Sequence, residues 1–331
     1  MPIHTRLCDL LSIRYPIIQA SMALITTPEL VAAVSNAGGL GTLGSDAGAQ
    51  PPGADVEEVG RRQREAIRAT RALTKNPFAV GINIGLDERG RASSQRRVEV
   101  VMEERVPVVL FSTGGPQVYT KLLRDQGIHV LHAVSTVRHA KKCADEGVSA
   151  VVTESFEAGG HSGFDELTTF VLVPQVRDAV ELPVVAGGGV ADARALVAAL
   201  ALGADGVYMG TRFAASVESK AHPRFKQAIL DAPDTGTQSW GRKIFVARSL
   251  RNQFTEEYLR LEGSGASVEE LQKFIAGRVY SGYVQGDTQG GSLDMSASAG
   301  GIHEIKPATQ IVRDLVEGAE AVLKRLNAVV R

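Results

Sequence analysis

Short apolar runs alternate with amphipathic stretches along the chain from residue 15 to residue 211. The runs are rich in valine and isoleucine, and their apolar residues are consecutive rather than alternating with polar ones. This pattern is typical of strands that are covered on both faces, as in a parallel sheet. The predicted strands are Tyr15–Ala20, Leu40–Gly44, Phe78–Ile84, Val106–Ser112, His129–Val134, Ala150–Glu154, Pro183–Ala186 and Gly206–Met209.

The stretches between these strands predict helices, which are Pro28–Ala37, Val56–Leu73, Arg96–Glu104, Pro116–Gln126, Val137–Glu146, Leu167–Val180 and Asp192–Leu202. Several end in a glycine segment, where glycine supplies the left-handed conformation common at helix ends. These segments are NAGG, DQG, DEG and ALGAD, at Asn36, Gln126, Glu146 and Gly203. Eight strands with helices between them predict an α/β fold of the closed (β/α)8 TIM-barrel type rather than an open doubly wound sheet.

The pattern changes after Phe213. Residues 219–303 contain helical patterns joined by glycine-rich connectors, with no evident strand; the patterns are Pro223–Asp231, Phe254–Leu261 and Val268–Arg278. Pro307–Val329 is amphipathic, and its apolar face consists of Ile311, Leu315, Ala319, Val322 and Leu326. We therefore expect a barrel over residues 1–218, a helical subdomain covering the barrel mouth over 219–303, and a C-terminal helix over 304–331 that returns as the eighth outer helix.

Composition narrows the partners that we expect. The 331 residues are 44% hydrophobic and 22% charged, an ordinary balance for a globular protein with a sizeable core. The 36 basic and 37 acidic residues nearly cancel, so charge gives no case for nucleic acid or an anionic membrane as partner. Two cysteines, no signal-peptide pattern and no apolar run near the ~18 residues of a membrane span together predict a cytoplasmic location.

Small, neutral, hydrogen-bonding residues follow most of the predicted strands, at the end of the barrel where ligands bind. Gly187–Gly189 and Gly210–Thr211 follow the seventh and eighth strands, whose loops form the usual phosphate site with backbone N–H groups. Glycine is needed there because a Cβ atom would block close approach. Asp192 is placed to cap the following helix. The sequence predicts a phosphorylated ligand, and the alternative is a pair of tight turns without one.

His161 is the candidate acid–base residue. It lies in the segment FEAGGHSG after the sixth strand, where glycines allow the loop to fold over a pocket. Imidazole accepts or donates a proton near pH 7; the alternative is a loop histidine that only hydrogen-bonds backbone. His132 and His139 are expected to be packing or surface residues. No metal site is expected, because no histidine pair has H-x-x-x-H or H-x-H spacing and the cysteines are far apart.

Several segments resemble the nitronate monooxygenase (2-nitropropane dioxygenase-like) family. They are YPIIQASM, VSNAGGLGTLGS, PFAVGINI, FEAGGHSG, LPVVAGGGVAD and ALGADGVYMGTRF, with QGDTQGG at 285–291 extending the likeness over nearly the whole chain. The FMN-dependent enoyl-ACP reductases of the same superfamily resemble the chain almost as well. The ordered motifs are therefore specific for the superfamily and much less so for the reaction.

The resemblance implies one FMN per subunit in the barrel mouth. The cofactor-binding residues that it implies are Ala20, Ser21, Met22, Asn83, Gly160, Gly187, Gly188, Gly189, Gly210, Thr211, Gln285 and Gly286. The first three would lie along the flavin ring, Asn83 would hydrogen-bond it, and the next six would surround the ribityl phosphate. The last two would approach from the helical subdomain. His161 would be the catalytic base of a nitronate enzyme, or a substrate-site residue of a reductase.

Two departures from the family pattern alter the expected pocket. The family commonly has Gln-Gly-Gly-Met where this chain has Gln19, Ala20, Ser21 and Met22. One class of nitronate monooxygenases carries a lysine at the position of Ala133, which is apolar here as in the enoyl reductases. The EAGGH segment and the LTT segment at residues 167–169 also lean toward the reductases.

The leading hypothesis is an FMN-dependent oxidoreductase of nitronate monooxygenase type, which uses O2 to convert alkyl nitronates or nitroalkanes to carbonyl compounds and nitrite. The alternative is an NAD(P)H-dependent reductase acting on an enoyl thioester or a quinone. A third hypothesis, a non-catalytic barrel that senses a phosphorylated metabolite, predicts a protein that takes up no FMN. Each hypothesis has a small-molecule partner, and a homodimer is a possible oligomeric state. For the enzymes, we expect Gly188→Val to eject the cofactor by steric block.

Overall fold

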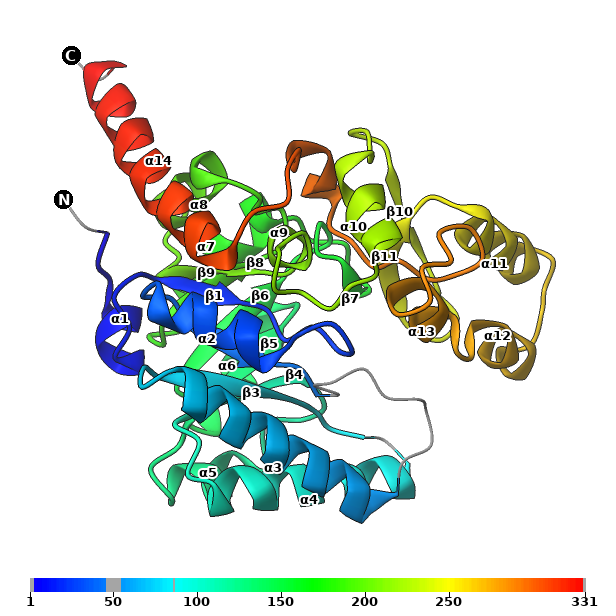
Figure 1. Cartoon of the computed structure of the whole chain (residues 1–331), viewed down its shortest axis with the longest axis horizontal. Helices are drawn as coiled ribbons and strands as arrows, with labels where there is room; N and C mark the ends of the chain where they lie inside the picture. The colour runs from blue at the N-terminus through cyan, green and yellow to red at the C-terminus, as the bar shows by residue number, and fades with distance from the viewer. Residues whose placement is uncertain (1–2, 46–54, 86, 330–331) are drawn as a thin grey trace.

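The predicted strands form a parallel barrel in the computed structural model, which describes residues 3–45, 55–85 and 87–329 (Figure 1). Around the ring they are β1 (Ile17–Gln19), β9 (Gly206–Met209), β8 (Val184–Gly187), β6 (Ala150–Glu154), β5 (His129–Val134), β4 (Val108–Thr113), β3 (Phe78–Asn83) and β2 (Gly41–Leu43). Backbone hydrogen bonds of 2.9 Å from Gln19 to Leu40 and from Leu40 to Ile17 join β2 back to β1. The predicted (β/α)8 fold is confirmed.

Helices cover the outside of this ring. They are α2 (Pro28–Asn36), α3 (Val56–Leu73), α4 (Glu88–Glu103), α5 (Thr120–Arg124), α6 (Val137–Asp145), α7 (Thr169–Ala179) and α8 (Ala193–Ala201). The predicted N-cap of α8 is confirmed, since the Asp192 carboxylate accepts the backbone N–H groups of Arg194 and Ala195. The predicted glycine ends are also confirmed, with φ values from +74° to +98° at Gly38, Gly127, Gly147 and Gly203.

A short helix that the sequence pattern did not predict, α1 (Arg6–Leu11), closes the N-terminal end of the barrel. The Arg6 guanidinium donates a 2.8 Å hydrogen bond to the carboxylate of Asp205, the residue just before β9. Leu7 is fully buried and shares a core with residues of the barrel interior, among them Ile18 and Val185. With this end filled by apolar side chains, only the C-terminal end of the strands remains for a ligand.

The last helix, α14 (Ala308–Val329), supplies the predicted eighth outer helix. Its buried residues share one core with α2 and α8 through Ile311, Val312, Leu315, Leu30, Val34, Leu196 and Val197. The predicted apolar face packs on this core as far as Val322, and Ala319 within it is fully buried. Leu326 is 42% exposed, because the end of α14 runs past the barrel toward the C-terminus (Figure 1).

The segment 219–303 contains strands as well as helices. After α9 (Thr211–Ala214), its elements are α10 (Pro223–Leu230), β10 (Thr237–Trp240), β11 (Val246–Leu250), α11 (Gln253–Gly263), α12 (Val268–Ile275), α13 (Arg278–Tyr283) and the 3-10 helix η1 (Ala297–Gly301). β10 and β11 are antiparallel, and β11 also pairs with β7 (Gly160–Ser162), from the loop after β6. The prediction of no strand was wrong, because β10 and β11 are short, partly polar strands of a hairpin, and β11 finds its second partner, β7, far away in sequence.

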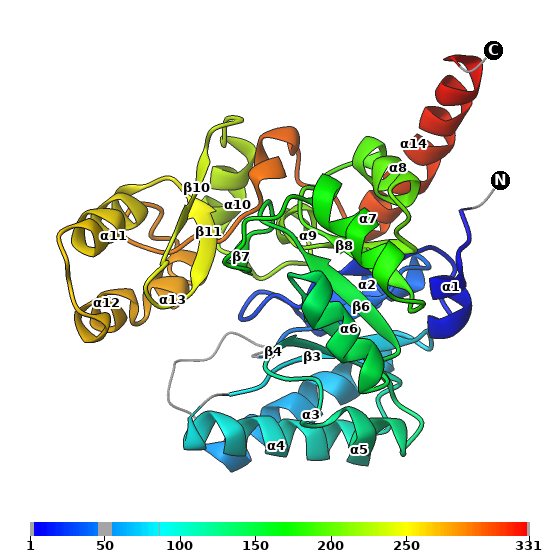
Figure 2. The ribbon, with the colours of Figure 1, turned by 180° about the vertical axis from the view of Figure 1, so that it is seen from behind.

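The three-stranded sheet β10-β11-β7 connects this segment to the barrel. Figures 1 and 2 show α10 to α13 beside the barrel on the side of β7, away from α3, α4 and α5. The single helix predicted over residues 268–278 is interrupted at Gly277, where φ is +77°. Within the described parts of the chain, no helix has the length and apolar character needed to cross a membrane.

Candidate functional site

A cavity of about 500 Å³ lies at the C-terminal ends of the barrel strands, between the barrel and the segment 219–303. Its volume is within the range of small-molecule and cofactor sites. The predicted site residues that line it are Ala20, Ser21, Met22, Asn83, Gly160, His161, Gly187, Gly188, Gly189, Gly210 and Thr211. Residues chosen from five separate segments of the sequence are thus neighbours around one cavity.

Gln285 and Gly286 lie outside this lining. Gly286 has a φ of +74°, and a Cβ atom on it would lie 2.1 Å from Nδ1 of His222, next to the start of α10. Two residues of α13, Val279 and Tyr283, line the cavity instead. The sequence showed a glycine-rich connector in this region, but not which turn of the preceding helix faces the barrel.

The loops after β8 and β9 offer backbone N–H groups for an anionic ligand. Gly188 and Gly189 are left-handed, with φ of +100° and +74°. No carbonyl of the described residues accepts a hydrogen bond from the N–H of Gly188, Gly189 or Thr211. Unpartnered N–H groups in two neighbouring loops are the donor set that a phosphate group requires.

Polar contacts hold the Gly188 loop against the loop after β6. The Glu157 carboxylate accepts the backbone N–H of Thr169 at 2.9 Å. The Thr169 hydroxyl lies 2.7 Å from Oγ of Ser155 and 3.0 Å from the carbonyl oxygen of Gly188. A Cβ atom on Gly188 would lie 2.2 Å from Ser155 Oγ, so packing as well as φ requires glycine here. The contacts fix this wall of the cavity before any ligand binds.

Two titratable side chains in the cavity were missed by the sequence analysis. Tyr208 of β9 accepts a 2.8 Å hydrogen bond from the backbone N–H of Ser21. Glu154 ends β6, and no ion pair or hydrogen bond to another described residue holds its carboxyl group. Burial raises the pKa of Glu154 to about 8, so the group keeps its proton at neutral pH and can donate a hydrogen bond. The feature of the sequence that could have identified Glu154 is a carboxyl group at the end of an apolar strand.

His161 lies in β7, where the segment 219–303 fixes its backbone. The residue pairs with Ala247 of β11, and its ring centroid lies 4.6 Å from that of Phe245. His161 is exposed and lines the cavity. A strand that is paired on one edge therefore holds this residue, while the imidazole stays open to a ligand. It can exchange a proton with a molecule bound in the cavity.

The segment 219–303 also contributes a carboxylate. Asp294 lines the cavity and accepts hydrogen bonds from the hydroxyls of Ser249 at 2.6 Å and Ser292 at 2.9 Å, both to Oδ1. Its second oxygen, Oδ2, would lie 3.7 Å from a Cβ atom on Gly160. Nothing in the local sequence LDMS distinguishes this aspartate, because Ser292 is an ordinary neighbour two residues away and the other partner, Ser249, comes from β11.

Comparison with known proteins identifies the family. Residues 4–94 and 88–318 match the family model described as nitronate monooxygenase. The chain belongs to the nitronate monooxygenase family. The resemblance drawn from the motifs is confirmed, and the protein is an enzyme of the oxidoreductase class.

Relatives of known name divide between two kinds of reaction. A probable nitronate monooxygenase of Staphylococcus aureus (strain MSSA476) is 33% identical over 301 residues, which are 78% of this chain and 81% of the relative. A protein of Rhodococcus jostii (strain RHA1), named (3aS,4S,5R,7aS)-5-hydroxy-7a-methyl-1-oxo-octahydro-1H-indene-4-carboxyl-CoA dehydrogenase, is 38% identical over 228 residues, 69% of this chain and 60% of that protein.

Two solved structures are similar to this chain over nearly its whole length. FabK from Thermotoga maritima has a TM-score of 0.90 and 38% identity, with 99% of each chain covered. Nitroalkane oxidase from Streptomyces ansochromogenes has a TM-score of 0.80 and 28% identity, covering 97% of this chain and 99% of that one. The barrel and the segment beside it are therefore shared by proteins with different names.

Proposed function

We propose that the cavity holds FMN and that the enzyme oxidises alkyl nitronates, or nitroalkanes that it first deprotonates, to carbonyl compounds and nitrite with O2. The observation that carries the proposal is the meeting, in one cavity, of an open imidazole and glycine loops whose N–H groups have no carbonyl partner. The imidazole suits proton transfer, and the loops suit a phosphate. The match to the nitronate monooxygenase family supports this reaction class.

The residues around the cavity fit FMN. The N–H groups of Gly188, Gly189 and Thr211 would bind the phosphate, and Ala20 and Ser21 are small enough for a flat ring to lie against them. Asn83 and the protonated Glu154 would hydrogen-bond the ring. When bound, FMN supplies the electron-transfer chemistry that amino-acid side chains lack.

His161 has a different task for each form of the substrate. For a neutral nitroalkane, the imidazole takes the proton from the carbon that bears the nitro group and leaves an anionic nitronate in the cavity. A nitronate that enters already deprotonated needs no base. Apolar side chains of the cavity wall, Met22 and Val279, would supply a surface for the alkyl group.

The second candidate is an NAD(P)H-dependent reductase of an enoyl thioester or a quinone. The observation that favours it is the similarity to FabK, which extends over 99% of both chains. If this chain were such a reductase, the same cavity would hold the cofactor, and His161 would position the substrate rather than take a proton from carbon.

Steady-state turnover of the FMN-loaded enzyme tests the proposal. With propyl-2-nitronate and air, and without NADH or NADPH, we expect O2 consumption together with nitrite release. Turnover that requires NADH or NADPH and produces no nitrite would contradict the proposal and favour the reductase. A protein that takes up no FMN at all would favour the sensor hypothesis.

A further inference from the structure

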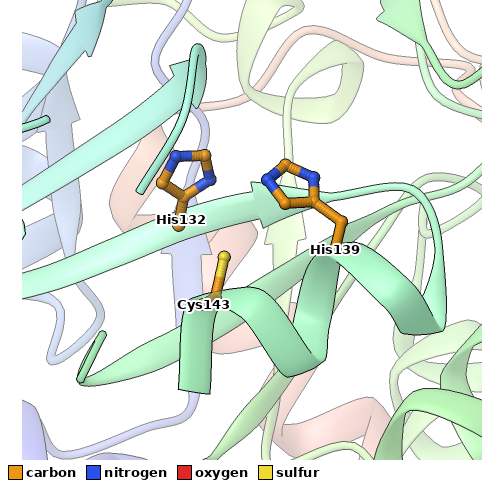
Figure 3. A group of neighbouring side chains, drawn as sticks. All are labelled: His132, His139 and Cys143. Carbon is orange, nitrogen blue, oxygen red and sulfur yellow. The ribbon is translucent and has the colours of Figure 1, made fainter. Parts of the chain in front are cut away.

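Two histidines and a cysteine meet on the outer side of the barrel, between β5 and α6. One nitrogen from each imidazole of His132 and His139 and the sulfur of Cys143 lie within 4.8 Å of one another. Figure 3 shows the sulfur pointing toward the space between the two rings. None of the three lines the cavity described above. We propose that these residues form a binding site for one Cu(I) ion, independent of the proposed function.

The local structure brings the donors together with little freedom. His132 shares the outer face of β5 with Val130 and Val134, and both valines belong to the core under the helices. On α6, His139 and Cys143 are one helical turn apart and so occupy the same face. The Thr136 hydroxyl caps the helix by accepting the N–H of His139 at 3.2 Å. The strand and the capped helix therefore fix the spacing of the three groups.

The two imidazoles are available as neutral ligands. Nδ1 of His132 lies 2.9 Å from the carbonyl oxygen of Ala133, and because a carbonyl only accepts, this nitrogen carries the proton. The other nitrogen, Nε2, is buried and has no hydrogen-bond partner among the described residues. Nε2 therefore has a lone pair that no described residue uses and that a metal ion can take up. Burial lowers the pKa of His132 to about 4 and also lowers that of His139, so protons do not compete near pH 7.

Metal binding requires two small changes in this cluster. The His132 ring must turn about its Cβ–Cγ bond, a soft torsion, to direct the Nε2 lone pair at the other donors, and this turn gives up the hydrogen bond of Nδ1 to the carbonyl oxygen of Ala133 in exchange for the metal bond. The Cys143 thiol, whose pKa burial raises to about 12, must exchange its proton for the metal. The step is Cys143–SH plus Cu(I) giving a Cu–S bond and one proton released to solvent, with no change of oxidation state.

The choice of Cu(I) follows from the donors and from charge. Nitrogen and sulfur ligands without a carboxylate disfavour Mg²⁺ and Ca²⁺ and suit copper or zinc. Zinc in structural sites takes four ligands, and the described residues of this cluster supply three. Cu(I) with one thiolate is neutral, whereas Zn²⁺ would leave a net positive charge in an apolar core near Lys142 and Arg138.

Anaerobic titration of the intact, cofactor-loaded protein with Cu(I), supplied as its bicinchoninate complex, tests the site. We expect one Cu(I) per chain, one proton released, and an X-ray absorption spectrum with two nitrogen ligands and one sulfur ligand. His139→Ala and Cys143→Ser should each weaken Cu(I) binding by at least about 100-fold. Loss of a residue that only orients a ligand costs up to about this factor, and loss of a direct ligand should cost more. Cys8→Ser and His303→Ala, which change residues outside the cluster, are the matched controls and should bind Cu(I) normally.

Thermal unfolding with and without Cu(I) tests the site in each variant separately, so a variant that is less stable can still be compared with the wild type. Cu(I) should raise the unfolding temperature of the wild type and of both controls, and leave that of His139→Ala and Cys143→Ser unchanged. Equal binding by the wild type and the Cys143→Ser variant would overturn the site. Stabilisation by Zn²⁺ but not by Cu(I) would overturn the choice of ion.

Discussion

Strand pairing fixes the backbone of His161, while its imidazole ring is exposed to the cavity. Pairing between β7 and β11 fixes the main chain, and the contact with Phe245 limits where the ring can lie. The flanking glycines of the sequence indicated a pocket loop, but the strand pairing could not be predicted, because β11 lies far along the chain. The role of His161 in proton transfer remains a prediction from its type and place.

Replacing His161 separates its proton transfer from cofactor binding. His161→Ala should keep FMN, since the substitution leaves the loops after β8 and β9 unchanged, and should still oxidise a nitronate. Its kcat/KM for a neutral nitroalkane should fall by about 10²–10⁴-fold, the usual contribution of a general base. His303→Ala, an exposed histidine outside the cavity, is the control. Loss of FMN from His161→Ala would contradict the placement of this residue beside the substrate.

Glu154 predicts a pH effect on stability in the FMN-free protein. Its pKa is about 8 in the folded state and near its ordinary value when unfolded, so between these values the folded state binds more protons. The free energy of unfolding should therefore fall as pH rises from 5.5 to 7.5, by up to about 1.4 kcal/mol per pH unit. Urea unfolding of the wild type and of Glu154→Gln over this pH range measures the change in the free energy of unfolding. The same pH slope in both proteins would show that Glu154 is not buried as described.

At the scale of elements, continuous apolar runs identify the barrel strands because both faces of each strand are covered. The short strands beside the barrel escaped prediction: β10 and β11 form a hairpin of partly polar residues, and β7 pairs with β11 only after the chain has folded back. The cluster of His132, His139 and Cys143 escaped for the same reason, since a strand and a helix must pack before it exists.

Two glycines in the loops after β8 and β9, where we propose that the phosphate of FMN binds, should respond differently to substitution. A side chain on Gly188 would clash with Ser155 and Ala158 and would need an unfavourable φ, so Gly188→Val should distort the loop itself besides blocking the cavity. A Cβ atom on Gly210 would meet only Ala20 and Met22, at 3.7 and 3.9 Å. Gly210→Leu should then abolish FMN binding without loss of stability, and Gly210→Ala should bind FMN. Flavin fluorescence titration and urea unfolding measure both effects. Normal FMN affinity in Gly210→Leu would place the cofactor elsewhere.

At the scale of the whole molecule, the barrel depends on its last helix. α14 completes the outer layer by packing between α2 and α8. The C-terminal part of the chain must therefore reach α2, the first helix of the outer layer, before the core is closed. The amphipathic pattern of the C-terminal region was enough to predict this return. How the segment 219–303 meets the barrel was not predictable, because the contacts join residues that are about 90 positions apart, such as Gly160 and Arg248.

A substitution in α14 tests this dependence. Leu315 is 3% exposed, and Leu315→Ala should lower the free energy of unfolding by about 2–5 kcal/mol through loss of buried apolar contacts. Leu326→Ala changes the same residue type in the same helix at a position that is 42% exposed, and should change stability by about 0.5 kcal/mol or less. Urea unfolding followed by circular dichroism compares them. Similar values for both variants would mean that α14 does not close the core.

The proposed function requires that a nitronate gives electrons to FMN in the cavity beside His161. Anaerobic mixing of the FMN-loaded enzyme with propyl-2-nitronate, NADH or NADPH, followed by flavin absorbance, tests it most directly. We expect rapid loss of the oxidised-flavin absorbance with the nitronate alone, and none with either nicotinamide. Rapid bleaching by NADH or NADPH, with no response to the nitronate, would contradict it.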